Sequence, residues 1–111
     1  MAKTRIGIAQ LKPTLGDIGK NLALVEEYIR RAKEQKIELL VLPELGLSGY
    51  HLRDMVPVVA MHDEHPVIRK LLSHSRDISL VFGYPEESSD HQFYNSALYL
   101  EGGELIHRHR K

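Results

Sequence analysis

The sequence contains no cysteine in its 111 residues. This absence excludes a disulfide framework, a thiolate-bound zinc or iron–sulfur site, and a cysteine nucleophile within the chain. An excess of basic charge is also missing, because 15 Lys and Arg balance 15 Asp and Glu, which excludes the basic footprint typical of nucleic-acid binding. No apolar run approaches the roughly 20 residues that cross a bilayer, and no signal-peptide pattern opens the chain. We therefore expect a cytoplasmic protein with no nucleic-acid partner and no membrane partner.

The apolar residues that are present, 42% of the chain, are sufficient for one packed domain. Their spacing predicts strands where they run together and helices where they recur every three or four positions. The expected elements are a buried strand over 5–11, a helix over 18–35 capped by Asp17, a buried strand over 38–42, a long loop over 44–61, a helix from Pro66 to about 75, a strand over 78–83, a polar loop over 84–92, and strands over 93–100 and 104–110. This β-α-β-α-β-β-β order is typical of an α/β fold with helices covering a sheet.

Glu44 is the first residue that could carry chemistry. It directly follows the expected buried strand over 38–42, and open α/β sheets bind their ligands at such strand ends. Pro43 would end that strand, while Gly46 and Gly49 would let the chain turn tightly. A carboxylate beside an apolar strand end should have a raised pKa, which suits a general base. The alternative is that Glu44 simply begins a surface loop.

Gly102 and Gly103 predict a two-residue hairpin turn between the last two strands. With that turn, Lys111 lies at the far end of the hairpin, beside the start of the preceding strand. The alternative is a frayed, solvated lysine. The pairings that the turn predicts are Glu101 with Glu104, Leu98 with His107, Ser96 with His109, and Tyr94 with Lys111.

The last strand alternates histidine and arginine. Its alternation places His107, His109 and Lys111 on one face, and Arg108 and Arg110 on the other. Two histidines could ligate a metal, and two arginines could hold a phosphate or a carboxylate. The spacing provides no third ligand, and an exposed polar strand face explains the pattern equally well. We therefore expect no metal site.

Ser48 and Ser96 are the serines that could act as nucleophiles. Neither lies in a Gly-x-Ser-x-Gly elbow, and the spacing places no His–Asp pair beside them. The sequence also has no phosphate-binding loop and no dinucleotide fingerprint. We therefore expect no serine triad and no cofactor.

Four segments, in order, resemble the amino-terminal part of the nitrilase superfamily of carbon–nitrogen hydrolases. They resemble the family's first strand and the start of its first helix, the segment with its catalytic glutamate, the hairpin before its catalytic lysine, and the start of its lysine motif. In this sequence they are residues 6–13 with Gly16, Asp17 and Asn21; residues 42–45 with 48–50; residues 93–97 with the Gly102–Gly103 turn; and residues 109–111. The resemblance therefore runs along essentially the whole chain.

The resemblance implies a four-layer α-β-β-α sandwich, of which this chain would supply the amino-terminal half. It implies that Glu44 is the general base and that Lys111 stabilises the oxyanion of a tetrahedral intermediate. It also implies a cysteine nucleophile that attacks the carbon of a small-molecule amide or nitrile and forms an acyl-enzyme. No metal and no organic cofactor take part, and the sandwiches often form homo-oligomers.

The sequence departs from the family at the nucleophile, because the family's cysteine lies downstream of its lysine. We therefore expect residues 1–111 to be a partial carbon–nitrogen hydrolase domain, truncated at the lysine motif and inactive on its own. Residues 10–17 also resemble the glutamine amidohydrolase domain of glutamine-dependent NAD synthetases. Two non-catalytic alternatives remain: a module that pairs with another copy or with a separate second half, and a small domain that binds an anion through Arg108 and Arg110.

Overall fold

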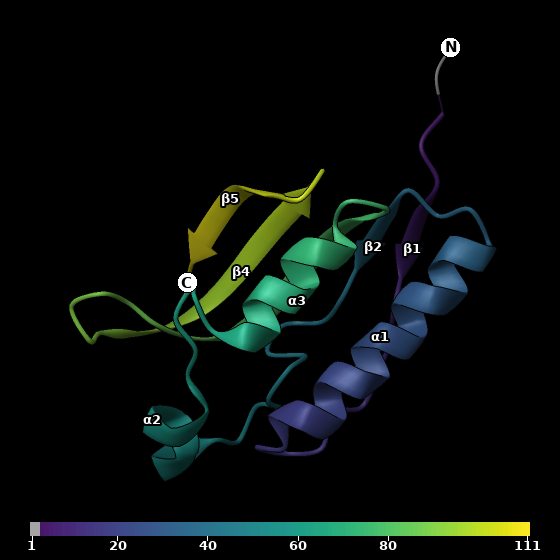
Figure 1. Cartoon of the computed structure of the whole chain (residues 1–111). Coiled ribbons are helices and arrows are strands. Elements are labelled where there is room, and N and C mark those ends of the chain that lie inside the picture. The colour runs from purple at the N-terminus through teal and green to yellow at the C-terminus, as the bar shows by residue number, and fades with distance from the viewer. Residues whose placement is uncertain (1–2) are drawn as a thin grey trace.

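A single five-stranded sheet organises the molecule (Figure 1). The structure, a computed structural model, describes residues 3–111. The strands lie in the sheet in sequence order: β1 (Ile6–Ile8), β2 (Leu39–Val41), β3 (Ser79–Glu87), β4 (Phe93–Glu101) and β5 (Glu104–Arg110). β1, β2 and β3 are parallel, whereas β4 and β5 are antiparallel to their neighbours. The α/β class and the predicted order of elements are therefore confirmed.

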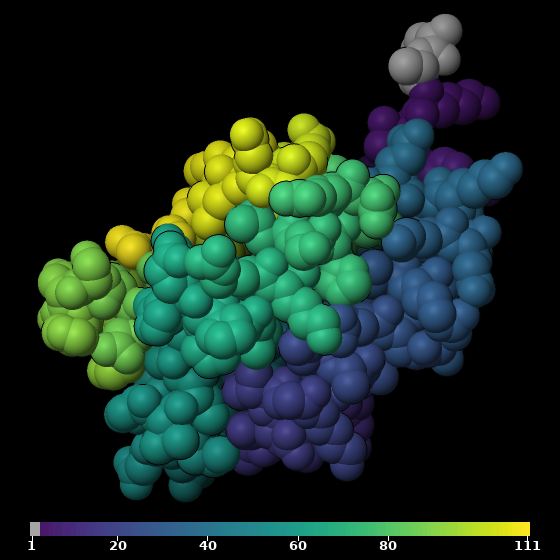
Figure 2. All heavy atoms as spheres, in the orientation of Figure 1, coloured from purple at the N-terminus to yellow at the C-terminus, as the bar shows by residue number. Residues whose placement is uncertain are grey.

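The helices lie on one face of the sheet, as the right-handed crossovers between parallel strands require (Figure 1). They are α1 (Ile18–Glu34) and α3 (Pro66–His74), with the short η1 (Arg53–Met55) and α2 (Val56–Val59) inside the expected loop. Figure 2 shows α1 and α3 side by side, and Glu26 joins them through Lys70 at 3.4 Å and His74 at 2.7 Å. No helix within residues 3–111 is long and apolar enough to cross a bilayer.

The core lies between these helices and the sheet. The Asp17 side chain accepts a hydrogen bond from the Lys20 amide, which is the predicted cap of α1. The predicted apolar face of α1 packs inward, with Val25 and Ile29 almost fully buried. These side chains pack against apolar residues of α3 and of the central strands. The α3 residues are Ile68 and Leu71, and the strand residues are Leu40, Leu80, Phe82, Leu98 and Leu100.

No helix of residues 3–111 covers the opposite face of the sheet. The prediction that the first strand is buried is wrong, because Ile6 and Ile8 are 56% and 75% exposed. β1 is an edge strand, and only Gly7 faces the helices, where it lies against Ile37 and Leu40. The described chain therefore forms one helix layer and one sheet layer, which are two of the four layers of an α-β-β-α sandwich.

β3 is longer than the sequence predicts. The expected polar loop over 84–92 is wrong in its first part, because the strand continues through Pro85 to Glu87. β2 ends at Val41, opposite Val81, so Pro85 lies beyond the pairing with β2. Met61 then bridges β3 through the Pro85 carbonyl and the Glu87 amide, so the missing N–H of Pro85 costs no hydrogen bond. As a result, Glu86 is a buried strand residue rather than a loop residue.

The hairpin forms at the predicted turn, but its register shifts along β5. Gly102 and Gly103 have φ angles of 61° and 81°, and Glu101 faces Glu104 as expected. A β-bulge then leaves Ile106 without an opposite residue. The pairings predicted beyond it are wrong by one position: Tyr99 faces His107, Leu98 faces Arg108, Ala97 faces His109, and Ser96 faces Arg110.

Candidate active site

Glu44 lies in a tight turn just beyond the carboxyl end of β2, as the sequence predicts. The Leu42 amide still donates to the carbonyl of Val81 at 2.8 Å, and Pro43 then directs the chain away from the sheet. Leu45 has a φ of +50°, in the left-handed region that is unfavourable for a residue with a side chain. Such strained backbone is frequent at functional sites because the surrounding structure must enforce it.

Gly83 of β3 permits this turn to lie against the sheet. A Cβ atom at position 83 would lie 2.6 Å from the backbone nitrogen of Leu45 and 3.0 Å from the Cα of Glu44. Both neighbours are backbone atoms, which cannot rotate away. Glycine at this position is therefore a condition for the observed placement of Glu44.

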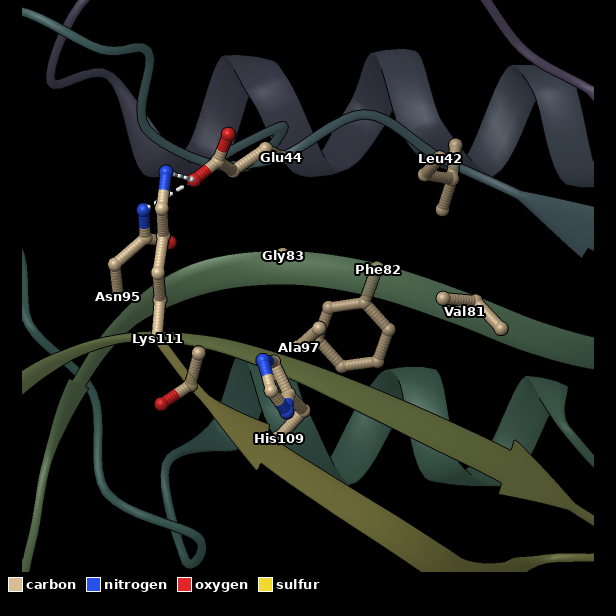
Figure 3. A pocket seen from close by; sticks show the side chains of 10 residues that line it. Leu42, Glu44, Val81, Phe82, Gly83, Asn95, Ala97, His109 and Lys111 are labelled. Carbon is tan, nitrogen blue, oxygen red and sulfur yellow. Dashed lines mark hydrogen bonds and ion pairs between the residues drawn. The ribbon is translucent and has the colours of Figure 1, made fainter.

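Three donors surround the Glu44 carboxylate, and Figure 3 shows two of them, Asn95 and Lys111. The Asn95 side-chain amide of β4 donates to Oε1 at 2.5 Å, and the Lys111 ammonium lies 3.3 Å from the same oxygen. The Tyr50 hydroxyl donates to Oε2. The structure therefore brings Glu44 and Lys111 together, although they are 67 positions apart in the sequence.

The carboxylate of Glu44 has a lowered pKa, so the prediction of a raised pKa is wrong. Hydrogen bonds from Tyr50 and Asn95 are the main causes, the Lys111 cation adds to them, and together they outweigh desolvation. The hydrogen bond to Glu44 in turn raises the pKa of Tyr50. Glu44 is therefore ionised at neutral pH and able to accept a proton.

Lys111 follows the last residue of β5, and its backbone is tied to the sheet. Its amide donates to the carbonyl of Asn95 at 2.9 Å. Its side chain is 72% exposed and lies on the open face of the sheet, beside Glu44. The Lys111 backbone is therefore paired with β4, while its side chain remains largely exposed to solvent.

A hollow of about 370 Å³ lies beside this pair, on the open face of the sheet (Figure 3). The lining residues are Leu42, Glu44, Val81, Phe82, Gly83, Asn95, Ser96, Ala97, His109 and Lys111. Its polar groups converge at one end, where a carboxylate accepts protons and an ammonium can stabilise negative charge. This arrangement suits acid–base chemistry on a small molecule with a polar reacting group.

The other sequence candidates have different environments. The Ser48 hydroxyl donates to the carbonyl of Gly49, and the Ser96 hydroxyl donates to Glu86, so both are used in internal hydrogen bonds. Within residues 3–111, no group of three or more His, Asp or Glu side chains is arranged to hold a metal. Arg108 and Arg110 form ion pairs with Glu86, which disfavours the hypothesis that they hold an external anion.

Sequence reasoning assigned no role to several residues that build the site. Tyr50 and Asn95 lie within the segments that carry the family resemblance, but nothing in their spacing predicts that both donate to one carboxylate. Gly83 ends an expected strand, and only the structure shows what it adjoins. Glu86 was expected in a loop because it follows Pro85, and proline usually marks the end of a strand.

Comparison with known proteins now identifies the family. The family model described as carbon–nitrogen hydrolase matches residues 5–111. The chain belongs to the carbon–nitrogen hydrolase family. The resemblance stated from the four sequence segments is therefore confirmed, and so is the fold that it implied.

Relatives of the chain are longer and differ in their named activities. A glutamine-dependent NAD(+) synthetase of Thermotoga maritima is 34% identical over 112 residues, which covers 100% of this chain and 19% of the relative. A protein N-terminal amidase of Saccharomyces cerevisiae is 29% identical over 121 residues, which covers 100% of this chain and 26% of the relative. The chain thus spans only about a fifth to a quarter of the length of these two relatives.

A solved structure gives the same result for the fold. A double mutant of the amidase from Nesterenkonia sp. AN1, in complex with acrylamide, superimposes with a TM-score of 0.82 at 28% identity. The superposition covers 97% of this chain and 42% of the amidase. The helix and sheet layers described above are therefore part of a larger nitrilase-type fold in this relative.

Proposed function

We propose that Glu44 and Lys111 are the general base and the oxyanion-stabilising cation of a carbon–nitrogen hydrolase site for small-molecule amides or nitriles. The observation that carries this proposal is the convergence of Lys111 and Asn95 on one oxygen of Glu44. An ionised carboxylate can accept a proton, and the neighbouring ammonium, at the rim of a hollow, can stabilise negative charge.

The proposed reaction is acyl transfer through a thiol. Glu44 takes the thiol proton, and the thiolate attacks the amide carbon to form a C–S bond. The carbonyl oxygen gains negative charge and accepts a hydrogen bond from the Lys111 ammonium. Collapse breaks the C–N bond, and the leaving nitrogen takes the proton from Glu44 as ammonia or an amine departs. Water, deprotonated by Glu44, then hydrolyses the thioester to a carboxylic acid and restores the thiol.

The thiol has to come from outside these residues, because the sequence contains no cysteine. Residues 1–111 would then be a partial domain that is inactive alone. The open face of the sheet, with Ile6 and Ile8 exposed, supports a partner there, either a second half that carries the nucleophile or another copy of the chain. We also infer a cytoplasmic location, which cell fractionation would test.

Glutamine is a second candidate substrate. The observation that favours it is the similarity to the Thermotoga maritima NAD(+) synthetase, whose name states that it depends on glutamine. In this version, Glu44 and Lys111 act in the same way on the side-chain amide of glutamine, and the ammonia released is used by another domain.

Ammonia release tests both candidates. The complete product of the gene is assayed with a short aliphatic amide and with glutamine, beside Glu44→Gln, Lys111→Ala and the control Glu87→Gln. Glu87 contacts His91 on the surface, so its substitution removes a neighbouring carboxylate without touching the site. We expect activity in the wild type and in Glu87→Gln, and a loss of about 100-fold or more in the other two variants.

Several outcomes would overturn the proposal. Full activity in Glu44→Gln or in Lys111→Ala would remove that residue from its role. Failure of the wild-type gene product to release ammonia from either substrate would contradict the proposed activity. Ammonia release by the 111-residue chain alone would contradict the need for a thiol.

A further inference from the structure

A second carboxylate, Glu86 of β3, lies on the helix-covered side of the sheet, opposite the face on which Asn95 and Lys111 meet Glu44. It is only 2% exposed, and all of its partners are charged or hydroxyl donors. Arg110 binds it through Nε at 3.0 Å and Nη2 at 2.7 Å, and Arg108 approaches it to 2.5 Å. The Ser96 hydroxyl also donates a hydrogen bond to Glu86, at 2.6 Å. Glu86 therefore holds one residue of β4 and two of β5 at once.

The two carboxylates use neighbouring residues of the same strands. On β4, Asn95 donates to Glu44 on the open face, and Ser96 donates to Glu86 on the helix-covered face. At the end of β5, Arg110 turns to Glu86, and the next residue, Lys111, turns to Glu44. Because side chains alternate along a strand, fixing one residue of each pair fixes the direction of the other.

We propose that Glu86 is a positioning residue, which clamps the ends of β4 and β5 so that Asn95 and Lys111 meet the carboxylate of Glu44. This inference rests on the proposed function, because it assigns Glu86 a role only through the Glu44–Lys111 pair. Glu86 itself does not touch the hollow in which the substrate would lie.

The position of β5 explains why such a clamp is needed. β5 is an edge strand, and the bulge at Ile106 has already shifted its register by one residue. A further slip of one position would turn Lys111 to the helix-covered face and remove it from Glu44. Two arginines bound to one buried carboxylate oppose that slip, because charge-assisted hydrogen bonds are strong and directional.

The surroundings of Glu86 keep its carboxylate ionised. Burial alone would raise the pKa of Glu86, but hydrogen bonds from Arg110, Ser96 and Arg108 outweigh burial and set the pKa at about 2. Arg108 is anchored a second time, by Asp63 at 2.5 Å and by the Tyr84 hydroxyl at 3.1 Å. Glu86 is therefore ionised at neutral pH, as its ion pairs with Arg108 and Arg110 require.

Two readouts on the 111-residue chain distinguish positioning from a merely structural role. One is the pKa of Glu44, followed by carbon-13 NMR of the carboxylate. The other is hydrogen exchange of the Lys111 amide, which bonds to the Asn95 carbonyl, with the Leu42 amide reporting the rest of the sheet. If Glu86 only stabilised the fold, a folded variant would keep the wild-type pKa of Glu44, and exchange of the Lys111 amide would change no more than exchange of the Leu42 amide.

The variants are Glu86→Gln and Arg110→Gln, with Arg31→Gln as the control. Arg110 is partly exposed, so its substitution keeps the proposal testable where Glu86→Gln does not fold. Arg31 is paired with Glu27 on the surface of α1, far from the clamp in the sequence. Arg110→Lys keeps a cation beside Glu86 and should rescue part of the effect.

We expect Glu86→Gln and Arg110→Gln to raise the pKa of Glu44 towards its ordinary value. We also expect Lys111 amide exchange to become roughly tenfold faster, with Leu42 exchange unchanged. Both readouts at wild-type values in folded Arg110→Gln would overturn the proposal, as would equal effects in Arg31→Gln. Neither readout needs catalysis, so a failure here is distinct from a failure of the proposed function, which the ammonia assay tests.

Discussion

The Lys111 ammonium lies 3.3 Å from Oε1 of Glu44, across the open face of the sheet. Neither residue belongs to a regular element, since Glu44 follows β2 and Lys111 follows β5. The contact exists because the carboxyl ends of β2 and β5 lie at the same end of the sheet. Asn95, on the neighbouring strand β4, also bonds to both residues, through its side chain to Glu44 and through its carbonyl to Lys111. The chemistry of the site therefore depends on hydrogen bonds that hold two chain segments rather than on the two charges alone.

Tyr50→Phe should raise the pKa of Glu44. The Tyr50 hydroxyl is the largest single cause of the lowered pKa, and phenylalanine removes that donor while keeping the ring. Titration of the Glu44 carboxylate by carbon-13 NMR measures the effect. Tyr99→Phe is the matched control, because its hydroxyl donates to Glu101 on the same sheet. An unchanged Glu44 pKa in Tyr50→Phe would show that this hydrogen bond does not set the ionisation of the site.

Gly83→Ala should destabilise the protein and displace the Glu44 turn. The added methyl group would lie 2.6 Å from the backbone nitrogen of Leu45, so the turn must move. We expect a loss of about 1–3 kcal/mol in the free energy of unfolding, measured by urea denaturation, together with a shift of the Glu44 pKa. Gly19→Ala, at an exposed and open position in the first turn of α1, is the control and should not destabilise the protein. Equal stability of the two variants would contradict the close approach.

Local patterns in the sequence predict the α/β elements well. The three- and four-residue spacing of α1 and its Asp17 cap are local signals, and the structure reproduces both. The Gly102–Gly103 turn is equally local and was placed correctly. The bulge at Ile106 was not predictable, because it depends on how β5 packs along β4 and not on the turn.

The site was predictable only in part, for the same physical reason. Glu44 could be found because it follows an apolar strand end, and Lys111 because its segment resembles the family's lysine motif. The direction of the Glu44 pKa shift was not predictable, because it depends on Tyr50 and Asn95, donors from distant parts of the chain. Glu86 was missed because burial of a carboxylate requires partners that only the folded sheet brings together.

Ile8→Gln should weaken self-association of the 111-residue chain. Ile8 is 75% exposed on the face of the sheet that no helix covers, and exposed apolar sheet faces promote association. Sedimentation velocity over a range of concentrations measures the effect. Val58→Gln is the control, because Val58 is 84% exposed but lies on α2 rather than on a strand of the open sheet face. A wild-type chain that stays monomeric at all concentrations, or an equal effect of both substitutions, would contradict association through the open sheet face.

Acid should unfold the protein through Glu86. Its pKa is about 2 in the folded protein against an ordinary value of 4.5, so the unfolded chain binds the proton first as the pH falls. The ion pairs of Glu86 therefore contribute fully above about pH 5, and their contribution of roughly 3 kcal/mol is lost between about pH 5 and pH 2. Urea denaturation at a series of pH values measures this loss.

The variant Glu86→Gln isolates the contribution of this carboxylate. It should be less stable than the wild type at pH 7, because Arg108 and Arg110 lose their shared anion. The difference between the two proteins should shrink as the pH falls, since the wild-type Glu86 becomes neutral as well. Glu87→Gln removes the neighbouring, more exposed carboxylate and should keep the wild-type acid dependence. A stability difference between wild type and Glu86→Gln that is constant from pH 7 to pH 2 would show that the ionisation of Glu86 is not what stabilises the ends of β4 and β5.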